Sequence, residues 1–245
     1  LDTLMIIITM FLFGLIGFID DYEKIAKKNN LGMTPKQKIA LQLLFSLLIA
    51  LYMMIFKDDG TLIFIPFIKK YIDFGILFIP FVIFVELAMS NAVNLTDGLD
   101  GLASSVTIVF SIILIAIGIS KQDKILVVTG ASTAGALVGF LYFNWSPAKI
   151  FMGDTGSMAL GGLLSAVAIV TKMELLLPII GIIYVLEALS VILQVTYFKK
   201  TGGKRLFRMS PLHHHFELGG MSEKKISFLF SFVTIIFGII EFIFS

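Results

Sequence analysis

The sequence contains no cysteine and little charge. The absence of cysteine excludes disulfide bonds and thiolate metal sites, so oxygen or imidazole ligands must hold any bound metal. Only 15% of the 245 residues are charged and 58% are hydrophobic, whereas soluble domains carry about 25% charged residues and are about half apolar. With a mean hydropathy of +0.98, this composition indicates an integral membrane protein.

Several familiar sequence features are also missing. The chain has no phosphate-loop, dinucleotide-binding or zincin motif, and it shows no internal repeat, low-complexity tract or second domain. We therefore expect a single integral membrane domain over residues 1–245. The first residue is Leu1, and the first apolar run lacks the basic start and cleavage site of a signal peptide. We expect the natural protein to begin upstream.

Eight apolar runs approach the length of about 20 residues that a spanning helix needs. They cover residues 3–19, 39–56, 74–93, 102–119, 125–143, 156–171, 175–198 and 225–244. This pattern predicts an all-α, polytopic membrane helix bundle of about eight transmembrane helices. The seventh run is long enough to tilt or kink, and the loop 57–73 can form a small hairpin.

Lysine and arginine are distributed unevenly between the two sides of this bundle. One side consists of the loops 20–38, 94–101, 144–157 and 199–224. With Lys225 it carries 13 of the 19 Lys and Arg residues. Cytoplasmic loops hold the excess of these residues, so this side is expected to face the cytoplasm. Every unusual polar motif falls on it.

The first two of these loops are rich in carboxylates and amides. Asp20 and Asp21 are adjacent at the end of the first helix, where negative charge is unfavourable; a divalent metal or a bound lysine would relieve their repulsion. The second loop has polar residues at three-residue spacing, which would share one face of a helical turn. They are Asn91, Asn94, Asp97 and Asp100, with Gly98 and Gly101 allowing close backbone approach. A plain polar turn is the alternative, but the cost of polar groups between two spans favours a functional site.

The third loop contains the sequence FMGDTGS, which places Asp154 between two glycines at the start of an apolar run. Free N–H groups of that helix, at 155–157, could bind phosphate; alternatively, Asp154 is only an N-cap. The fourth loop holds all three histidines and both arginines, which are His213, His214, His215, Arg205 and Arg208. Arginine beside histidine indicates recognition of an anion. Aspartates from three loops on one side favour Mg²⁺ or Mn²⁺ beneath a diphosphate.

Four motifs resemble one known family. They are GFIDDYEK with TPKQK, NAVNLTDGLDGLA, FNWSPAKIFMGDTGS and RMSPLHHHFELGG. In order and spacing they are similar to those of the polyprenyl-phosphate sugar-1-phosphate transferases, within which the PLHHHFE segment is typical of the phospho-N-acetylmuramoyl-pentapeptide transferases. That family has ten spans, and this chain would start at the third.

The resemblance implies transfer of phospho-N-acetylmuramoyl-pentapeptide from UDP-N-acetylmuramoyl-pentapeptide to undecaprenyl phosphate, with release of UMP. The expected setting is the bacterial plasma membrane; we expect no nucleic-acid partner, and a homodimer is left open. The predicted catalytic residues are Asp20, Asp21, Asp154 and His213, and the predicted Mg²⁺ ligands are Asp154 and Asp97. The predicted substrate-binding residues are Lys24, Lys36, Asn94, Asp97, Gly98, Asp100, Asn144, Phe151, Arg205, Arg208, His214 and His215.

Two further questions stay open at the level of sequence. The transferred group could be N-acetylglucosamine-1-phosphate instead, and an aspartate could act as a covalent nucleophile rather than as part of a one-step site. A transporter is the alternative from another class, with Glu86, Glu187 and Glu241 as coupling residues inside the spans. The clustering of the strongest acids on one side and the lack of related halves favour an enzyme.

Overall fold

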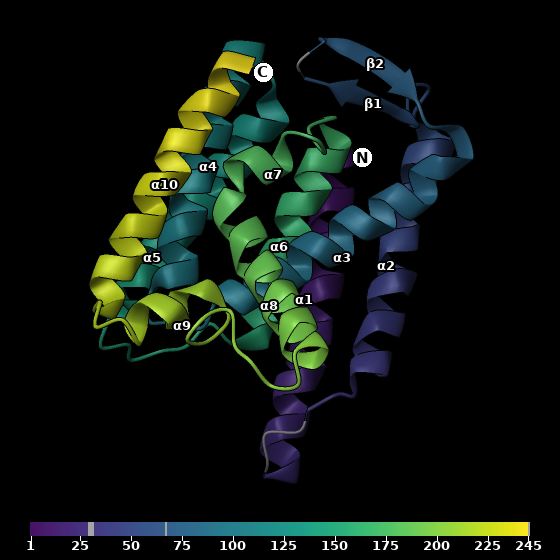
Figure 1. Ribbon diagram of the computed structural model, residues 1–245. Coiled ribbons are helices and arrows are strands. Elements are labelled where there is room, and N and C mark those ends of the chain that lie inside the picture. The colour runs from purple at the N-terminus through teal and green to yellow at the C-terminus, as the bar shows by residue number, and fades with distance from the viewer. Residues whose placement is uncertain (29–31, 67, 245) are drawn as a thin grey trace. The chain divides into compact units, whose positions relative to one another are not determined.

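The computed structural model describes residues 1–28, 32–66 and 68–244, the last without its side chain; residues 29–31 of the predicted loop 20–38 and residue 67 of the predicted hairpin lie outside the described residues. The elements in chain order are α1 (Asp2–Lys27), α2 (Pro35–Phe56), β1 (Leu62–Ile65), β2 (Lys70–Asp73), η1 (Gly75–Leu77), α3 (Phe78–Thr96), α4 (Leu102–Lys121), α5 (Lys124–Asn144), α6 (Gly153–Val170), α7 (Leu177–Ile180), α8 (Ile182–Lys200), α9 (Leu212–Glu217) and α10 (Glu223–Phe244). Figure 1 traces them from the purple α1 to the yellow α10.

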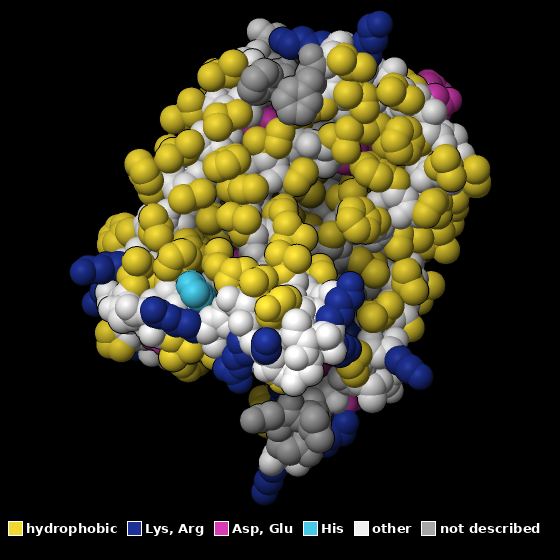
Figure 2. All heavy atoms as spheres, viewed as in Figure 1, with side chains coloured by type: hydrophobic (Ala, Val, Ile, Leu, Met, Phe, Trp, Pro, Cys, Tyr) yellow, Lys and Arg dark blue, Asp and Glu magenta, His cyan; other side chains and the backbone are white. Residues whose placement is uncertain are grey.

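Eight of the described helices are long and apolar enough to cross a membrane, which confirms the predicted all-α polytopic bundle. The helix of the seventh run is interrupted, because α7 ends at Ile180 and α8 begins at Ile182, with Gly181 between them. The predicted hairpin is also present: β1 and β2 pair antiparallel, with Leu62 opposite Asp73. Hydrophobic side chains cover most of the face shown in Figure 2, as expected for helices that contact lipid.

The chain divides into two compact units. Unit 1 comprises residues 1–94 and 152–177 with the last two residues, and unit 2 comprises residues 95–151 and 178–243. Unit 1 contains α1, α2, the hairpin, most of α3, and α6. Unit 2 contains α4, α5, α8, α9 and α10. The prediction of one integral membrane domain stays a prediction.

Close packing of α1 against α6 organises unit 1. A Cβ on Gly17 would overlap the backbone carbonyl of Asp154, and a Cβ on Gly14 would lie 3.1 Å from Cβ of Ala159. Likewise, a Cβ on Gly162 would lie 2.8 Å from Cβ of Phe13. Small residues let spanning helices approach each other closely. Because of these glycines, the C-terminal part of α1 lies directly beside the first turn of α6.

The ends of two helices differ from the prediction, and both differences change where polar residues lie. Helix α1 continues to Lys27, so Asp20 and Asp21 lie within its last two turns rather than at its end; Lys24 and Lys27 supply the positive charge that a C-terminus favours. Helix α3 ends at Thr96. Asp97 and Asp100 therefore lie in a turn, because the Gly-rich segment 97–101 leaves the helix. The prediction that they share a helical face with Asn91 and Asn94 is wrong for this reason.

Candidate active site

Three carboxylates converge in unit 1, as the sequence predicts. Asp20 and Asp21 come from α1 and Asp154 comes from the first turn of α6, and one oxygen of each lies within 4.8 Å of the other two. The side chain of Asp20 is almost fully buried, whereas those of Asp21 and Asp154 are partly exposed. We call this group the carboxylate triad. Three negative charges at this separation repel one another, so they require a cation.

Two lysines provide positive charge to the triad. Nζ of Lys24 lies 2.6 Å from Oδ2 of Asp20 and 3.1 Å from Oδ2 of Asp154. Nζ of Lys38, at the start of α2, lies 2.9 Å from Oδ2 of Asp154 and 3.6 Å from Oδ2 of Asp20. The triad with its two lysines carries a net charge of −1 when all five groups are ionised. The sequence predicted a bound lysine as one way to relieve the repulsion between Asp20 and Asp21. Such a lysine is present.

Asp21 joins the ends of α1 and α6. Its Oδ2 accepts hydrogen bonds from the backbone N–H of Thr155 at 2.9 Å and from Oγ1 of Thr155 at 2.8 Å, and its Oδ1 accepts from the N–H of Asp154 at 3.3 Å. The N–H of Gly156 donates to Met152 at 3.3 Å. The prediction of free phosphate-binding N–H groups is therefore wrong at these positions, because a carboxylate from α1 caps α6. Asp154 is not the N-cap; that residue is Met152.

Asn94 and Met33 complete the surroundings of the triad. Nδ2 of Asn94 donates to Oδ1 of Asp154 and to Oγ of Ser157, each at 2.9 Å, so this amide orients the Asp154 carboxylate from α3. The N–H of Met33 donates to Oδ1 of Asp20 at 2.8 Å. The predicted residues Asp20, Asp21, Lys24, Asn94 and Asp154 are thus brought together in one cluster.

The sequence prediction selected Lys36 in this loop and did not select Lys38. Lys36 is exposed, whereas Lys38 contacts the triad. A helical pattern could have identified the lysine that contacts the triad, since Lys38 lies four residues before Gln42 and eight before Ser46, both fully buried. Residues at this spacing share one face of a helix, and the buried face of α2 therefore points this lysine at the triad. The role of Lys36 stays a prediction.

The triad fits a divalent cation by its donor set. All its ligand atoms are carboxylate oxygens, which suit hard cations such as Mg²⁺, and the two ammonium groups already lie where positive charge is needed. These three carboxylates could therefore hold a metal ion. The other predicted metal ligand, Asp97, belongs to unit 2, and its role stays a prediction.

In unit 2, a histidine and a glutamate that are both fully buried form a pair. The backbone N–H of His213 donates to Oε1 of Glu187 at 3.1 Å, and Nδ1 of His213 lies 3.0 Å from Oε2 of the same carboxylate. A Cβ on Gly98 would overlap Nε2 of His213. The fourth predicted loop therefore packs on the second one at Gly98. The sequence marked Glu187 only as a coupling residue of the transporter alternative.

Two other predicted residues of unit 2 hold the loop at 145–151 in place. Oδ1 of Asn144 accepts from Oγ of Ser104 at 2.8 Å, and its Nδ2 donates to the carbonyl of Ile150 at 3.0 Å. Oδ2 of Asp100 accepts from the N–H of Ala148 at 2.7 Å. Both side chains are therefore engaged within the protein. Phe151, by contrast, is 74% exposed and is available to a ligand.

The loop that carries the arginines is tied to α8 by Gln194, a residue without a motif in the sequence. Its Oε1 accepts from the N–H groups of Leu206 and Phe207, each at 2.9 Å. The N–H of Arg208 donates to Nδ1 of His215 at 3.1 Å, while His214 pairs with Glu217 at 2.8 Å. The guanidinium of Arg205 lies 3.2 Å from the carbonyl oxygen of Arg208. Gln194 follows Glu187 by seven residues, so the two side chains lie on the same face of α8. This spacing is the only feature of the sequence that could have pointed to Gln194.

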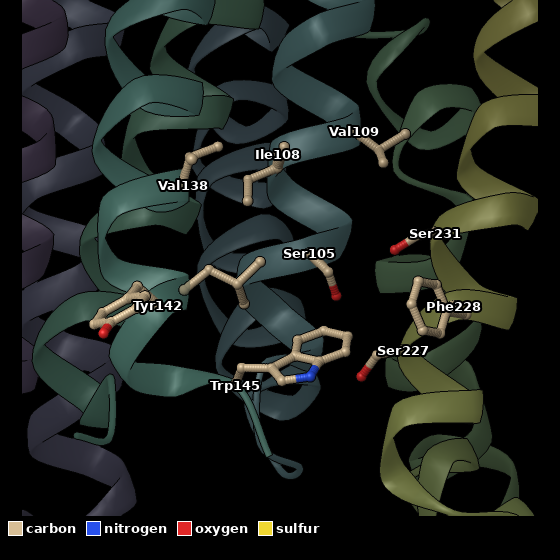
Figure 3. A pocket seen from close by; sticks show the side chains of 10 residues that line it. Ser105, Ile108, Val109, Val138, Tyr142, Trp145, Ser227, Phe228 and Ser231 are labelled. Carbon is tan, nitrogen blue, oxygen red and sulfur yellow. The ribbon is translucent and has the colours of Figure 1, made fainter. Parts of the chain in front are cut away.

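Unit 2 also contains an apolar groove with a volume of about 640 Å³ between α4, α5 and α10. Figure 3 shows Trp145 at one end of it, with the hydroxyl group of Ser105 on α4 and those of Ser227 and Ser231 on α10. The rings of Trp145 and Phe228 meet edge to face with centroids 5.6 Å apart. The groove is therefore an apolar surface on spanning helices with a few polar atoms.

Comparisons with known proteins agree with this geometry. The sequence model of glycosyl transferase family 4 matches residues 3–172, a range that includes the whole carboxylate triad. The chain belongs to glycosyl transferase family 4. It is therefore an enzyme of the transferase class, and its eight apolar helices make it a multi-pass membrane protein.

Several curated relatives are similar over nearly the whole chain. A protein of Clostridium beijerinckii (strain ATCC 51743 / NCIMB 8052) is 52% identical over 98% of this chain and 73% of its own length. One of Clostridium perfringens (strain 13 / Type A) is 52% identical over 94% of this chain and 72% of its own length. One of Listeria innocua serovar 6a (strain ATCC BAA-680 / CLIP 11262) is 49% identical over 98% of this chain and 74% of its own length. Each of them is named phospho-N-acetylmuramoyl-pentapeptide-transferase.

Proposed function

We propose that the protein transfers phospho-N-acetylmuramoyl-pentapeptide from its UDP carrier to undecaprenyl phosphate and releases UMP. The carboxylate triad with Lys24 and Lys38 carries this proposal, because such a cluster at the end of spanning helices suits a diphosphate and a phosphate at a membrane surface. Half-identical relatives that bear the name of this activity support it. The loops on the same side of the bundle as the cluster carry the excess of Lys and Arg residues, which supports a cytoplasmic location for the cluster.

In the proposed reaction, an oxygen of the lipid phosphate attacks the β-phosphorus of the UDP-sugar. The bond from that phosphorus to the oxygen of UMP breaks, so the lipid diphosphate and UMP are the products. Mg²⁺ held by Asp154 and its neighbours would, when bound, neutralise the diphosphate and stabilise the departing UMP.

The lysines of the cluster bind and position phosphate oxygens in this proposal. Lys24 and Lys38 each contact both Asp20 and Asp154, so Asp20 holds the two ammonium groups in place. A phosphomonoester has its second pKa near ~6, so the acceptor is mostly deprotonated at neutral pH. The contacts of Asp20 therefore favour a role in positioning over a role as a general base.

In unit 2, we propose that the nucleotide and the sugar phosphate contact the predicted polar residues. Phe151 offers an exposed aromatic ring for the uracil, and Arg205 and Arg208 offer guanidinium groups to phosphate oxygens. Asp97, Asp100 and the three histidines are the remaining proposed contacts. A homodimer and the metal role of Asp97 stay predictions.

The test of this proposal is release of UMP by the purified protein in vesicles that contain undecaprenyl phosphate. Each UDP-sugar is supplied in turn, and UDP-N-acetylmuramoyl-pentapeptide is expected to give Mg²⁺-dependent UMP while UDP-N-acetylglucosamine gives none. The opposite preference would favour the related transferase. UMP exchange into the UDP-sugar in vesicles without lipid phosphate would overturn the one-step reaction in favour of a covalent aspartate.

A further inference from the structure

The pairing of Glu187 with His213 has a chemical consequence for the histidine. Both side chains have no exposed surface. A backbone N–H can only donate, so Oε1 of Glu187 must be an acceptor at 3.1 Å. An ionised carboxylate has no proton to donate, and its second oxygen lies 3.0 Å from Nδ1. Beside an ionised Glu187, the proton of a neutral imidazole belongs on Nδ1.

We infer that Glu187 is a positioning residue, which fixes His213 as the Nδ1–H tautomer and so presents an unprotonated Nε2 as a hydrogen-bond acceptor for the substrate. A carboxylate partner on one ring nitrogen defines the role of the other nitrogen in this way at many functional sites. This inference rests on the proposed function, and it assigns Glu187 to the site although this glutamate lies inside a spanning helix.

Nε2 itself is the second observation that points to a ligand. It is buried and has no hydrogen-bond partner among the described residues, although a buried acceptor without a partner is costly. Its neighbour is the backbone of Gly98, where a Cβ would overlap the ring nitrogen. Gly98 therefore keeps side chains away from Nε2. The group that would satisfy an unprotonated Nε2 is a hydrogen-bond donor, and the nucleotide sugar offers hydroxyl and amide N–H groups of this kind.

The first test is the tautomer itself, measured without any variant. In protein labelled with ¹⁵N-histidine and reconstituted in vesicles, His213 is expected to show a protonated Nδ1 and an unprotonated Nε2 at neutral pH. His214 also has its Nδ1 beside a carboxylate oxygen, 2.8 Å from Oε2 of Glu217, so the signal of His213 is identified by its response to a change at Glu187. Glu187→Gln is expected to reverse this signal, because the amide of glutamine donates to Nδ1 while its oxygen keeps the backbone N–H. An Nε2–H form for the histidine whose signal responds to Glu187→Gln would overturn the inference.

The second test is kinetic and uses a matched control. Reversal of the tautomer places a donor against a donor, so Glu187→Gln is expected to raise KM for the UDP-sugar about 10- to 100-fold with a smaller effect on kcat. Glu86→Gln makes the same change at another fully buried glutamate of a spanning helix, one that accepts a hydrogen bond from Ser165 at 2.9 Å. This control is expected to keep the wild-type values of KM and kcat. An equal rise of KM in the two variants would show a general structural effect and overturn the inference.

A double variant separates positioning from folding. His213→Gln retains an acceptor at the end of the side chain that does not depend on a tautomer, so adding Glu187→Gln to it is expected to change KM less than about 3-fold. Full additivity of the two changes would contradict the inference. Failure of the wild-type protein to release UMP would refute the proposed function instead, and the ¹⁵N signal would still decide the tautomer.

Discussion

At the scale of single residues, the cluster in unit 1 depends on the balance between three carboxylates and two ammonium groups. Lys24 and Lys38 bridge Asp20 and Asp154, and Asp21 is engaged by the N-terminus of α6. A divalent cation and the lysines therefore compete for the same oxygens. We therefore expect the affinity of the triad for a divalent cation to depend on how many lysines contact its carboxylates.

This competition can be measured with Lys38→Met. Loss of one positive charge within 4 Å of two carboxylates is expected to strengthen Mn²⁺ binding about tenfold, because the interaction of charges at this separation is worth ~1–4 kcal/mol. The same variant is expected to slow UMP release about tenfold, since a phosphate ligand is lost. Titration calorimetry and the vesicle assay measure the two effects.

Lys27→Met is the matched control for that experiment. Lys27 lies in the last turn of α1 and pairs with Glu23 on the surface, so both cation affinity and UMP release are expected to stay at wild-type values. Weaker Mn²⁺ binding in Lys38→Met would contradict the competition between lysine and metal.

At the scale of helices, the carboxylates meet because α1 and α6 approach without intervening side chains. Gly17→Ala tests this contact, since its Cβ would overlap the carbonyl of Asp154. Overpacking costs about 1–3 kcal/mol, so a lower Tm and loss of most UMP release are expected. Fluorescence of Trp145, the single tryptophan of the chain, can follow unfolding in detergent.

Gly135→Ala on α5 is the control for helix glycines. A Cβ at this position would have no neighbour within 4 Å, and alanine is the better helix former by up to about 1 kcal/mol. Its Tm is expected to be unchanged or slightly raised. Equal losses of stability in the two glycine variants would mean that the close contact between α1 and α6 is not what Gly17 provides.

The helices could be predicted from the sequence, but several of their ends could not. The length of an apolar run is a property of the local sequence, so all eight spans were found. The polar last turns of α1 depend instead on partners from α2 and α6, such as Lys38 and Asp154. The proximity of Asp20, Asp21 and Asp154 was predicted because successive loops alternate between the two sides of a helix bundle, which places their loops on one side. The pairing of Glu187 with His213 was missed, because a buried acid inside a span has no local pattern that names its partner.

At the scale of the whole molecule, stability also depends on a loop that follows α6, the helix whose first turn carries Asp154. Glu174 lies between α6 and α7 and is 2% exposed. Burial raises its pKa to about 8, and the nearby Lys172 lowers it only in part. The folded state therefore prefers the protonated carboxyl, whereas the unfolded chain releases this proton near the ordinary pKa of 4.5.

The sign of the pH dependence follows from this difference. The contribution of Glu174 to stability is full below about pH 4.5 and is lost as pH rises toward 8. The Tm of the wild-type protein is expected to fall by several degrees relative to that of Glu174→Gln between pH 5 and 8. Parallel Tm curves for the two proteins over this interval would refute the buried, protonated glutamate.

The central claim is that Asp154 anchors a metal-dependent phosphate-transfer site. Its most direct test is Mg²⁺-dependent UMP release from UDP-N-acetylmuramoyl-pentapeptide by the wild type, by Asp154→Asn and by Asp123→Asn, all in vesicles with undecaprenyl phosphate. Asp123 caps α5 through the N–H of Ile125 at 2.8 Å, a role that asparagine also fills, so this control is expected to keep full activity. Asp154→Asn is expected to lower the rate about 100-fold or more. A wild-type rate in Asp154→Asn would contradict the claim.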